Sequence, residues 1–265
     1  MVRNNHVHKS EKVSFRKKKL FKQQEFFVGL SGWAMYIRTI RRSGVKAWFR
    51  STYFGRELVW RGKRYMFTLK KNRKSLKHLF LYGLVKKDAK KYLSKHPIKR
   101  PVPFLPSVHW NANLRKSKRN IVGIDLDNAY WQIARNMKVI SENTFNHGFR
   151  VIDNKMLTLS TLSSLGADKR YIVLKDGIKT NQVEIISGDE QLKRIYLKIR
   201  YNCFSYMQQA AALVGNDFVC YRTDCIYFFE SKRNIKAISN FFADKGFDYK
   251  FVGEWDGVIE DDERY

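Results

Sequence analysis

Two hydrophobic runs of β-branched and aromatic residues are the clearest pattern along this chain. The first covers residues 120–125 and the second covers residues 218–229. Runs of this kind predict buried strands, and we expect the second run to form a hairpin. Each run carries acidic residues where it ends or turns: Asp125 and Asp127 in the first, Asp224 in the second. A carboxylate beside a packed strand is costly unless it is paired or binds a metal, so these positions are the first candidates for chemistry.

Helical periodicity and strand-like composition predict further elements around these two runs. Helices are expected at residues 26–38, 74–95, 128–138, 155–165, 190–214 and 232–245. Strands are expected as a pair within residues 57–67 around Arg61-Gly62, at 171–175 and 182–186 around Asp176-Gly177, and at 248–252. This order of elements predicts an α+β protein, in which an antiparallel sheet with helices on one face follows a basic region of mixed helix and strand.

A proline cluster and a change in charge coincide near the middle of the chain. All four prolines lie between Pro97 and Pro106, and such a segment predicts a non-helical connector. Residues 1–120 hold 33 Lys and Arg against four acidic residues, whereas residues 121–265 hold 19 against 20. We therefore predict a basic flexible arm (1–25), a basic nucleic-acid-binding region (26–96), a proline-rich linker (97–119), a catalytic domain (120–252) and an acidic tail (253–265).

The charge of the first half indicates a polyanionic partner, most simply nucleic acid. The alternative is a nonspecific, solubilising surface. Aromatic residues interleaved with the charge favour nucleic acid, and Trp33, Trp48, Trp60 and Trp110 are candidates for stacking on unpaired bases. The candidate phosphate-binding residues are Arg16, Lys17, Lys18, Lys19, Arg41, Arg42, Lys70, Lys71, Arg115 and Lys116.

Cysteine content and hydropathy exclude several other classes of protein. The three cysteines have no paired spacing, and the histidines are scattered, which argues against a disulfide framework or a zinc site. The sequence contains no apolar segment long enough for a transmembrane helix, and its basic N-terminus lacks the apolar core of a signal peptide. We expect a cytoplasmic protein that has no membrane partner.

Two strands that carry carboxylates side by side would form an oxygen-ligand site for Mg²⁺ or Mn²⁺. A site of this kind supports phosphoryl transfer with two metal ions. Each carboxylate also has an ordinary structural explanation. Asp125 could cap the following helix, although Asp127 is the better cap by position, and Asp224 could belong to a tight turn.

The same residues resemble the palm domain of family B DNA polymerases. The family's first motif is a strand that ends in Asp and continues to a Tyr, and the run Asp125-Leu-Asp-Asn-Ala-Tyr-Trp131 is similar to it. The family's last motif, Tyr-x-Asp-Thr-Asp-Ser, is similar to Cys220-Tyr-Arg-Thr-Asp-Cys225. The resemblance covers residues 120–252 and implies a palm-like antiparallel sheet. Asp125 and Asp224 match the carboxylates that bridge both metal ions in the family.

The chain also departs from the family pattern. Arg222 replaces the first Asp of the hairpin motif. The middle motif, Lys-x-x-x-Asn-Ser-x-Tyr-Gly, is kept only at its end, in Ser163-Ser-Leu-Gly166, and Thr158 occupies the position of its lysine. Lys155 and Lys198 are candidate replacements for that lysine. The chain is too short for the family's exonuclease, large fingers and full thumb.

The resemblance implies template-directed nucleotidyl transfer, in which dNTPs are added to a primer 3′-hydroxyl with two Mg²⁺ or Mn²⁺ ions. Asp125 and Asp224 would bind the metals, and Tyr130 would lie under the incoming sugar and favour dNTPs. Lys155 or Lys198 would bind the triphosphate. The expected partners are primer–template DNA or RNA and, because subdomains are missing, a protein that supplies them. A compact enzyme of this kind would suit a phage or mobile element.

Several other functions are compatible with the same residues. Arg222 and the missing lysine favour a non-catalytic nucleic-acid-binding protein with a degenerate palm. A reverse transcriptase shares the palm, and Tyr221-Arg-Thr-Asp224 resembles its Tyr-x-Asp-Asp motif. A glycosyltransferase can use the Asp125-Leu-Asp127 pattern, but this class leaves Asp224 and the basic half unexplained. A nuclease can use the same two-metal chemistry.

Overall fold

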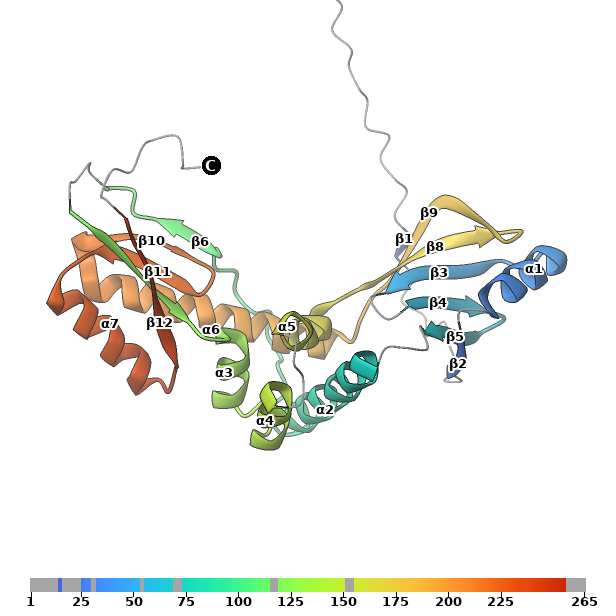
Figure 1. Ribbon diagram of the computed structural model, residues 1–265, viewed down its shortest axis with the longest axis horizontal. Coiled ribbons are helices and arrows are strands. Elements are labelled where there is room, and N and C mark those ends of the chain that lie inside the picture. The colour runs from blue at the N-terminus through green and yellow to red at the C-terminus, as the bar shows by residue number, and fades with distance from the viewer. Residues whose placement is uncertain are drawn as a thin grey trace, which may run out of the picture. The chain divides into compact units, whose positions relative to one another are not determined.

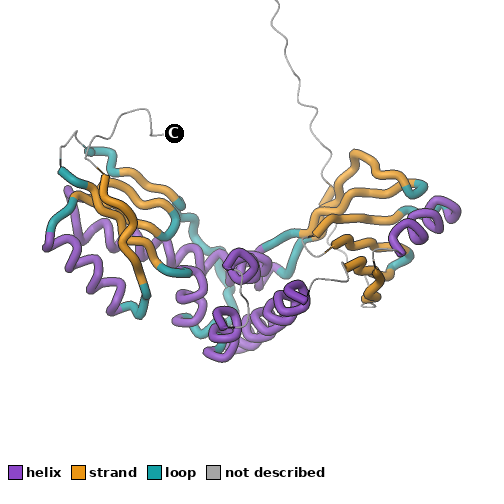
Figure 2. Tube along the Cα trace, viewed as in Figure 1, coloured by secondary structure: helices purple, strands orange, loops and turns teal. Residues whose placement is uncertain are grey.

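The computed structural model describes residues 14–15, 25–29, 32–52, 55–68, 73–114, 119–150 and 155–255. Within these ranges the chain is an α+β protein, as predicted from the sequence, and its strands form two sheets. The chain forms two compact units (Figures 1 and 2). Unit 1 comprises residues 1–79 and 167–190, and unit 2 comprises residues 80–166 and 191–265.

Unit 1 is built on a sheet whose strands come from two distant parts of the sequence. The strands are β1 (Ser14–Phe15), β2 (Glu25–Gly29), β3 (Ala47–Thr52), β4 (Gly55–Trp60), β5 (Lys63–Thr68), β8 (Lys169–Lys175) and β9 (Ile178–Ile186), in the order β1-β9-β8-β3-β4-β5-β2. The five strands from β9 to β5 pair antiparallel, and β1 and β2 pair parallel at the two edges. The segment 167–190 therefore extends a sheet whose other strands precede residue 69.

One face of the unit 1 sheet packs against helix α1 (Trp33–Ser43). Alternate residues of the strands, including Phe49, Leu58 and Phe67, form a buried core there. The ring of Trp33 lies 5.1 Å from the rings of both Phe49 and Phe67. Because successive strand residues point to opposite faces, the residues between these positions lie on the face away from α1.

The prediction of a helix across residues 26–38 is wrong in its first part. Residues 25–29 form strand β2, which pairs with β5, and the helix begins at Trp33. The run Phe26-Phe-Val28 has the composition of a strand, and Gly29 and Gly32 interrupt the helical pattern between the two elements. The paired strands around Arg61-Gly62 are confirmed as β4 and β5.

Unit 2 contains a five-stranded antiparallel sheet in the order β12-β7-β11-β10-β6. Its strands are β6 (Val108–Trp110), β7 (Ile121–Leu126), β10 (Phe218–Arg222), β11 (Cys225–Phe229) and β12 (Tyr249–Trp255). Its helices are α2 (Arg73–Lys95), which begins in unit 1, α3 (Ala129–Asn136), α4 (Glu142–Arg150), α5 (Lys155–Ser163), α6 (Glu190–Val214) and α7 (Lys232–Asp244). Figure 1 shows α6 and α7 beside one face of this sheet.

The two faces of the unit 2 sheet differ in character. Ile124, Ile226 and Phe228 are fully buried and lie on one face. On the other face, the strand register places Asp125, Cys225 and Lys250 in one row across three strands. The sheet therefore has a hydrophobic face and a face that carries ionisable residues at one end.

Most of the predicted elements are confirmed with small shifts of their ends. The strand at 120–125, the hairpin at 218–229, the helices at 74–95, 190–214 and 232–245, and the last strand correspond to β7, β10–β11, α2, α6, α7 and β12. The predicted linker 97–119 contains strand β6, which lies at the edge of the unit 2 sheet and pairs with β10. Within the described residues, none of the helices combines the length and hydrophobicity needed to span a bilayer.

Candidate functional site

The tight turn between β10 and β11 brings Asp224 to the end of β7. Arg222 pairs with Cys225, so Thr223 and Asp224 form the two-residue turn of the hairpin. The backbone N–H of Leu126 donates to the carbonyl oxygen of Asp224 at 3.0 Å. In the same register Asp125 lies opposite Cys225, the residue after Asp224. Asp125, on β7, and Asp224, in the turn before β11, are therefore neighbours across two paired strands.

Lys250 lies on β12, which pairs with β7 on the side away from β11, and it contacts both Asp125 and Asp127. Its Nζ lies 3.3 Å from Oδ2 of Asp125 and 3.6 Å from Oδ1 of Asp127. The hydrogen bond and charge of Asp125, and then the charge of Asp127, raise the pKa of Lys250. Lys250 was not among the site residues predicted from the sequence. Its only signal is its place in the last strand, where register brings it opposite Asp125.

Two buried thiols lie close to both carboxylates. Burial, followed by the charges of Asp224 and Asp125, raises the pKa of Cys203, a residue of α6. Cys225 is affected by burial and by the same two carboxylates, and its pKa rises to about 12. Both thiols are therefore protonated at neutral pH. Their shared sensitivity to Asp125 and Asp224 indicates that the two carboxyl groups face a common region.

Carboxylate oxygens are the donors that this region offers to a cation. Among the described residues, no group of three or more His, Cys, Asp or Glu side chains is arranged to hold a metal ion. A pair of carboxylates nevertheless fits Mg²⁺, because this ion is commonly held by one or two carboxylates together with water and substrate phosphates. Asp125 and Asp224 are the residues that would hold such an ion, and water and a phosphate-bearing ligand would complete its shell.

Tyr130 lies at the start of α3 and packs against α6. Its ring is half-buried and meets the ring of Tyr196 edge-on, with centroids 6.3 Å apart. Burial, followed by the nearby Cys203 and Tyr196, raises the pKa of Tyr130, although a hydrogen bond with Arg200 opposes this. The phenol is therefore neutral at physiological pH. Tyr130 lies near Cys203, and Cys203 lies near both carboxylates, so Tyr130 borders the same region.

Arg200 is a second residue that the sequence analysis missed. It shares a face of α6 with Tyr196 and Cys203, because residues separated by four and by three positions lie on the same side of a helix. Its charge opposes the rise in the pKa of Cys203 and of Tyr130, which places its guanidinium near both. Arg200 is therefore a cation that α6 directs toward the candidate site.

Gly166 supports the same wall of the site. A Cβ atom at this position would lie 2.5 Å from Cδ1 of Tyr196. The glycine therefore allows the turn after α5 to approach the Tyr196 ring directly. This close approach gives a physical reason for glycine at the end of Ser163-Ser-Leu-Gly166.

The two lysines predicted to bind phosphate occupy other positions. Lys155 is the first residue of α5, and its side chain lies outside the described part of the structure. Lys198 is half-buried on α6, two residues from both Tyr196 and Arg200, so it points to a different side of the helix. Arg222, which departs from the family motif, is exposed at the end of β10. The phosphate-binding role of Lys155 and Lys198 stays a prediction.

Of the basic residues predicted to bind nucleic acid, Arg41 and Arg42 are described. Both are exposed in the last turn of α1, where a cation also complements the helix dipole. Arg16, Lys17, Lys18, Lys19, Lys70, Lys71, Arg115 and Lys116 lie outside the described residues.

The candidate stacking tryptophans have mainly structural environments. Trp33 and Trp60 pack in the unit 1 core, and Trp110 packs beside a small buried cluster of unit 2. Trp48 is half-buried and donates from Nε1 to Glu184. Trp48 is the member of the set on the face of the unit 1 sheet away from α1.

The chain was compared with protein-family models, curated proteins and solved structures, and no match was found in any of the three comparisons.

Proposed function

We propose that this protein is a template-directed nucleotidyltransferase of the DNA polymerase type, and that unit 2 is its palm-like catalytic unit. The observation that carries the proposal is the strand register that places Asp125 opposite Cys225, next to Asp224. Two carboxylates brought together by paired antiparallel strands, one near the end of β7 and one in the hairpin turn, are compatible with two-metal phosphoryl transfer.

Asp125 and Asp224 would hold Mg²⁺ together with the substrate phosphates. When bound, such ions lower the pKa of a primer hydroxyl and neutralise charge on the triphosphate. Lys250 holds Asp125 in place before substrate arrives, through its 3.3 Å contact. Its positive charge also offsets the repulsion between neighbouring carboxylates before a cation binds.

Tyr130 and Arg200 would act on the incoming nucleotide. The neutral ring of Tyr130 is held by Tyr196 and Arg200, so it can form a fixed floor under a sugar and disfavour a 2′-hydroxyl. Arg200 lies near the same thiol as the carboxylates and can contact a phosphate as a fork of donors. Arg200 is thus a candidate for the role that the sequence analysis assigned to Lys155 or Lys198.

Primer extension tests this proposal. The wild type is compared with Asp125→Asn and Asp224→Asn on a primed DNA template with Mg²⁺ or Mn²⁺ and all four dNTPs. Asp244→Asn is the control, since Asp244 is an exposed carboxylate at the end of α7. We expect extension by the wild type and the control, and a loss of at least about a hundredfold in both site variants, with DNA binding retained. Extension that survives in either site variant would contradict the proposed role of that carboxylate.

The second candidate is a non-catalytic nucleic-acid-binding protein. It is favoured by Arg222 at the position of a family carboxylate and by the ion pair of Lys250 with Asp125. A wild-type protein that binds primed DNA tightly, but extends neither a DNA nor an RNA primer on DNA or RNA templates, would support this candidate over the enzyme.

A further inference from the structure

The face of the unit 1 sheet away from α1 carries two buried carboxylates, Glu57 and Glu184. Glu57 of β4 is fully buried, and Glu184 of β9 is 5% exposed. A buried carboxylate is unfavourable unless cations and hydrogen-bond donors satisfy it. The residues that pair with these two acids therefore indicate which class of ligand the face binds.

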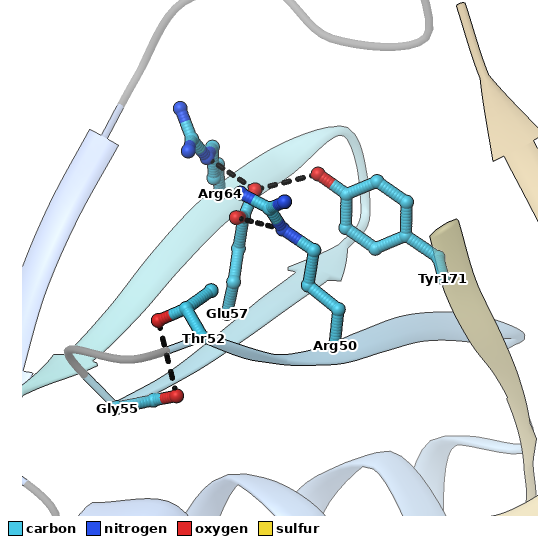
Figure 3. Close-up of polar contacts among 6 residues, drawn as sticks. All are labelled: Arg50, Thr52, Gly55, Glu57, Arg64 and Tyr171. Carbon is cyan, nitrogen blue, oxygen red and sulfur yellow. Dashed lines mark hydrogen bonds and ion pairs between the residues drawn. The ribbon is translucent and has the colours of Figure 1, made fainter. Parts of the chain in front are cut away.

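Glu57 is bound by two arginines and a tyrosine (Figure 3). Nε of Arg50 donates to its Oε2 at 2.6 Å, and Nε of Arg64 donates to its Oε1 at 2.5 Å. The hydroxyl of Tyr171 donates to Oε1 at 2.6 Å, and the guanidinium of Arg50 lies 5.5 Å from the centre of the Tyr171 ring. Glu57 therefore fixes two arginines from the strands that flank β4: Arg50 from β3 and Arg64 from β5.

The charge state of Glu57 is set by these partners. Burial alone would raise its pKa, but the hydrogen bond from Arg64 and the charges of Arg50 and Arg64 lower it to about 2. The carboxylate therefore stays ionised at any physiological pH, and it holds both guanidinium groups without neutralising their combined charge.

Glu184 repeats the arrangement on the neighbouring strands. Lys46 Nζ lies 2.7 Å from its Oε1, and the Trp48 indole donates to Oε2 at 2.7 Å. Lys46 also lies over the Trp48 ring, 5.5 Å from its centre. The cross-strand pairing of Glu184 with Tyr171 connects this group to the Glu57 group.

The acids are buried while the cations reach solvent. The side chains of Lys46, Arg50 and Arg64 are 42%, 26% and 21% exposed, whereas those of Glu184 and Glu57 are 6% and 0% exposed. An arginine that binds a carboxylate through Nε has its guanidinium plane fixed, and the two Nη groups that bind phosphate lie at the other end of that plane. Fixing the side chain in advance reduces the entropy lost on binding.

The charge of the whole unit supports an anionic ligand. The sequence of unit 1 contains 26 Lys and Arg and eight Asp and Glu. This excess attracts a polyanion from a distance, whereas the three fixed cations, Lys46 and Arg50 at β3 and Arg64 on β5, suit successive phosphates better than a single small anion.

We propose that Lys46, Arg50 and Arg64 form a phosphate-binding face that contacts the backbone of a nucleic acid. This site goes beyond the catalytic carboxylates. It rests on the proposed function only in taking nucleic acid as the substrate. Glu57 and Glu184 are positioning residues in it, since they hold the cations rather than touch the ligand.

Fluorescence anisotropy with labelled DNA over a series of salt concentrations tests the proposal. Arg50→Gln is compared with Arg56→Gln, which removes the same charge from the α1 side of the sheet, where Arg56 lies over the Trp33 ring. We expect Arg50→Gln to weaken binding and to reduce the slope of log affinity against log salt by about one. Arg56→Gln should leave that slope near its wild-type value. Equal effects of the two variants, or no effect of Arg50→Gln, would overturn the proposal.

Glu57→Gln provides a second test, in which a nonspecific effect of net charge and fixed arginines predict opposite results. The variant makes the protein more positive, so unspecific attraction predicts tighter binding. Fixed arginines predict weaker binding, because the neutral amide no longer holds both guanidinium groups. The measurement is made below the unfolding transition of the variant, with folding checked by circular dichroism. Tighter binding by a folded Glu57→Gln protein would contradict the positioning role.

The outcome is independent of catalysis. Asp125→Asn and Asp224→Asn should bind DNA with the wild-type salt slope even if they extend no primer. If the wild type proves inactive but the Arg50 effect holds, the proposed function fails and the binding face stands. If extension depends on both aspartates but the Arg50 and Arg56 variants behave alike, the proposed function stands and the phosphate-binding face fails.

Discussion

The backbone N–H of Leu126 donates to the carbonyl oxygen of Asp224 at 3.0 Å, and this bond connects the end of β7 to the turn of the β10–β11 hairpin. Asp125 precedes Leu126, so the same contact that fixes the turn also fixes the separation of the two candidate metal-binding residues. Thr223, the other turn residue, has a positive φ of 58°. A β-branched residue is strained in this conformation.

We predict that Thr223→Asn stabilises the protein by about 1 kcal/mol, because asparagine tolerates a left-handed backbone better than threonine. The measurement is the free energy of unfolding in urea. The matched variant Thr180→Asn replaces a threonine in strand β9 that is not among the residues of positive φ and should not stabilise. A destabilised Thr223→Asn protein would show that the threonine side chain contributes more than its backbone strain costs.

Lys250→Met should strengthen the binding of Mn²⁺. The substitution removes a positive charge that lies 3.3 Å from Asp125 Oδ2 and 3.6 Å from Asp127 Oδ1. We expect the dissociation constant for Mn²⁺, measured by calorimetry in the presence of a nonhydrolysable nucleotide, to fall by about threefold or more. Lys236→Met, at an exposed position of α7, should leave it unchanged. Weaker Mn²⁺ binding by Lys250→Met would show that losing the contact that holds Asp125 in place outweighs removing the competing positive charge.

Gly166→Ala should destabilise the protein by about 1–3 kcal/mol, because the new Cβ would overlap the Tyr196 ring. The added effect of Tyr196→Ala should be much smaller in the Gly166→Ala background than alone, since the smaller side chain removes the overlap. Gly83→Ala is the control. A Cβ at Gly83 meets nothing within 4 Å, and alanine in the middle of α2 should stabilise by about 1 kcal/mol. Strictly additive effects of the two site changes would contradict the contact.

The ion pairs of Glu57 predict a specific dependence of stability on pH. The pKa of Glu57 is about 2 in the folded protein against an ordinary value of 4.5, so its contribution is present above pH 4.5 and is lost as pH falls toward 2. A shift of this size corresponds to about 3 kcal/mol at neutral pH. Glu57→Gln should lower the free energy of unfolding at pH 7 by roughly that amount and by much less at about pH 3. An equal loss at both values would show that the ionised form of Glu57 does not contribute to stability.

Local sequence patterns were sufficient for most elements of unit 2. The strand β7 and the hairpin of β10 and β11 were predicted from continuous hydrophobic runs, which is how strands buried on a sheet face are recognised. The same patterns placed Asp125 and Asp224 at the ends of these strands. Their proximity, however, depends on pairing across about a hundred residues of sequence, and only the register of the sheet establishes it.

Other features depend on tertiary contacts that no local pattern reports. Arg200 and Lys250 resemble ordinary surface residues in sequence, and only helix packing and strand register place them near Asp125 and Cys203. Glu57 looks like a solvent-exposed acid in the sequence Gly-Arg-Glu-Leu-Val-Trp, yet it is fully buried between Arg50 and Arg64. The sequence also could not indicate that β8 pairs with β3 rather than with the unit 2 sheet.

The pairing of β3 with β8 has a consequence for the order in which the protein can be made. Strand β3 leaves the ribosome about 120 residues before β8, and it has no native neighbour on that side until β8 emerges. The nascent chain must therefore keep an open hydrophobic sheet edge in solution while most of the first part of unit 2 is translated. A fragment that ends after residue 79 would expose the same edge permanently, so we expect it to aggregate. A fragment in which residues 167–190 are fused directly after residue 79 should fold, because β8 then covers that edge.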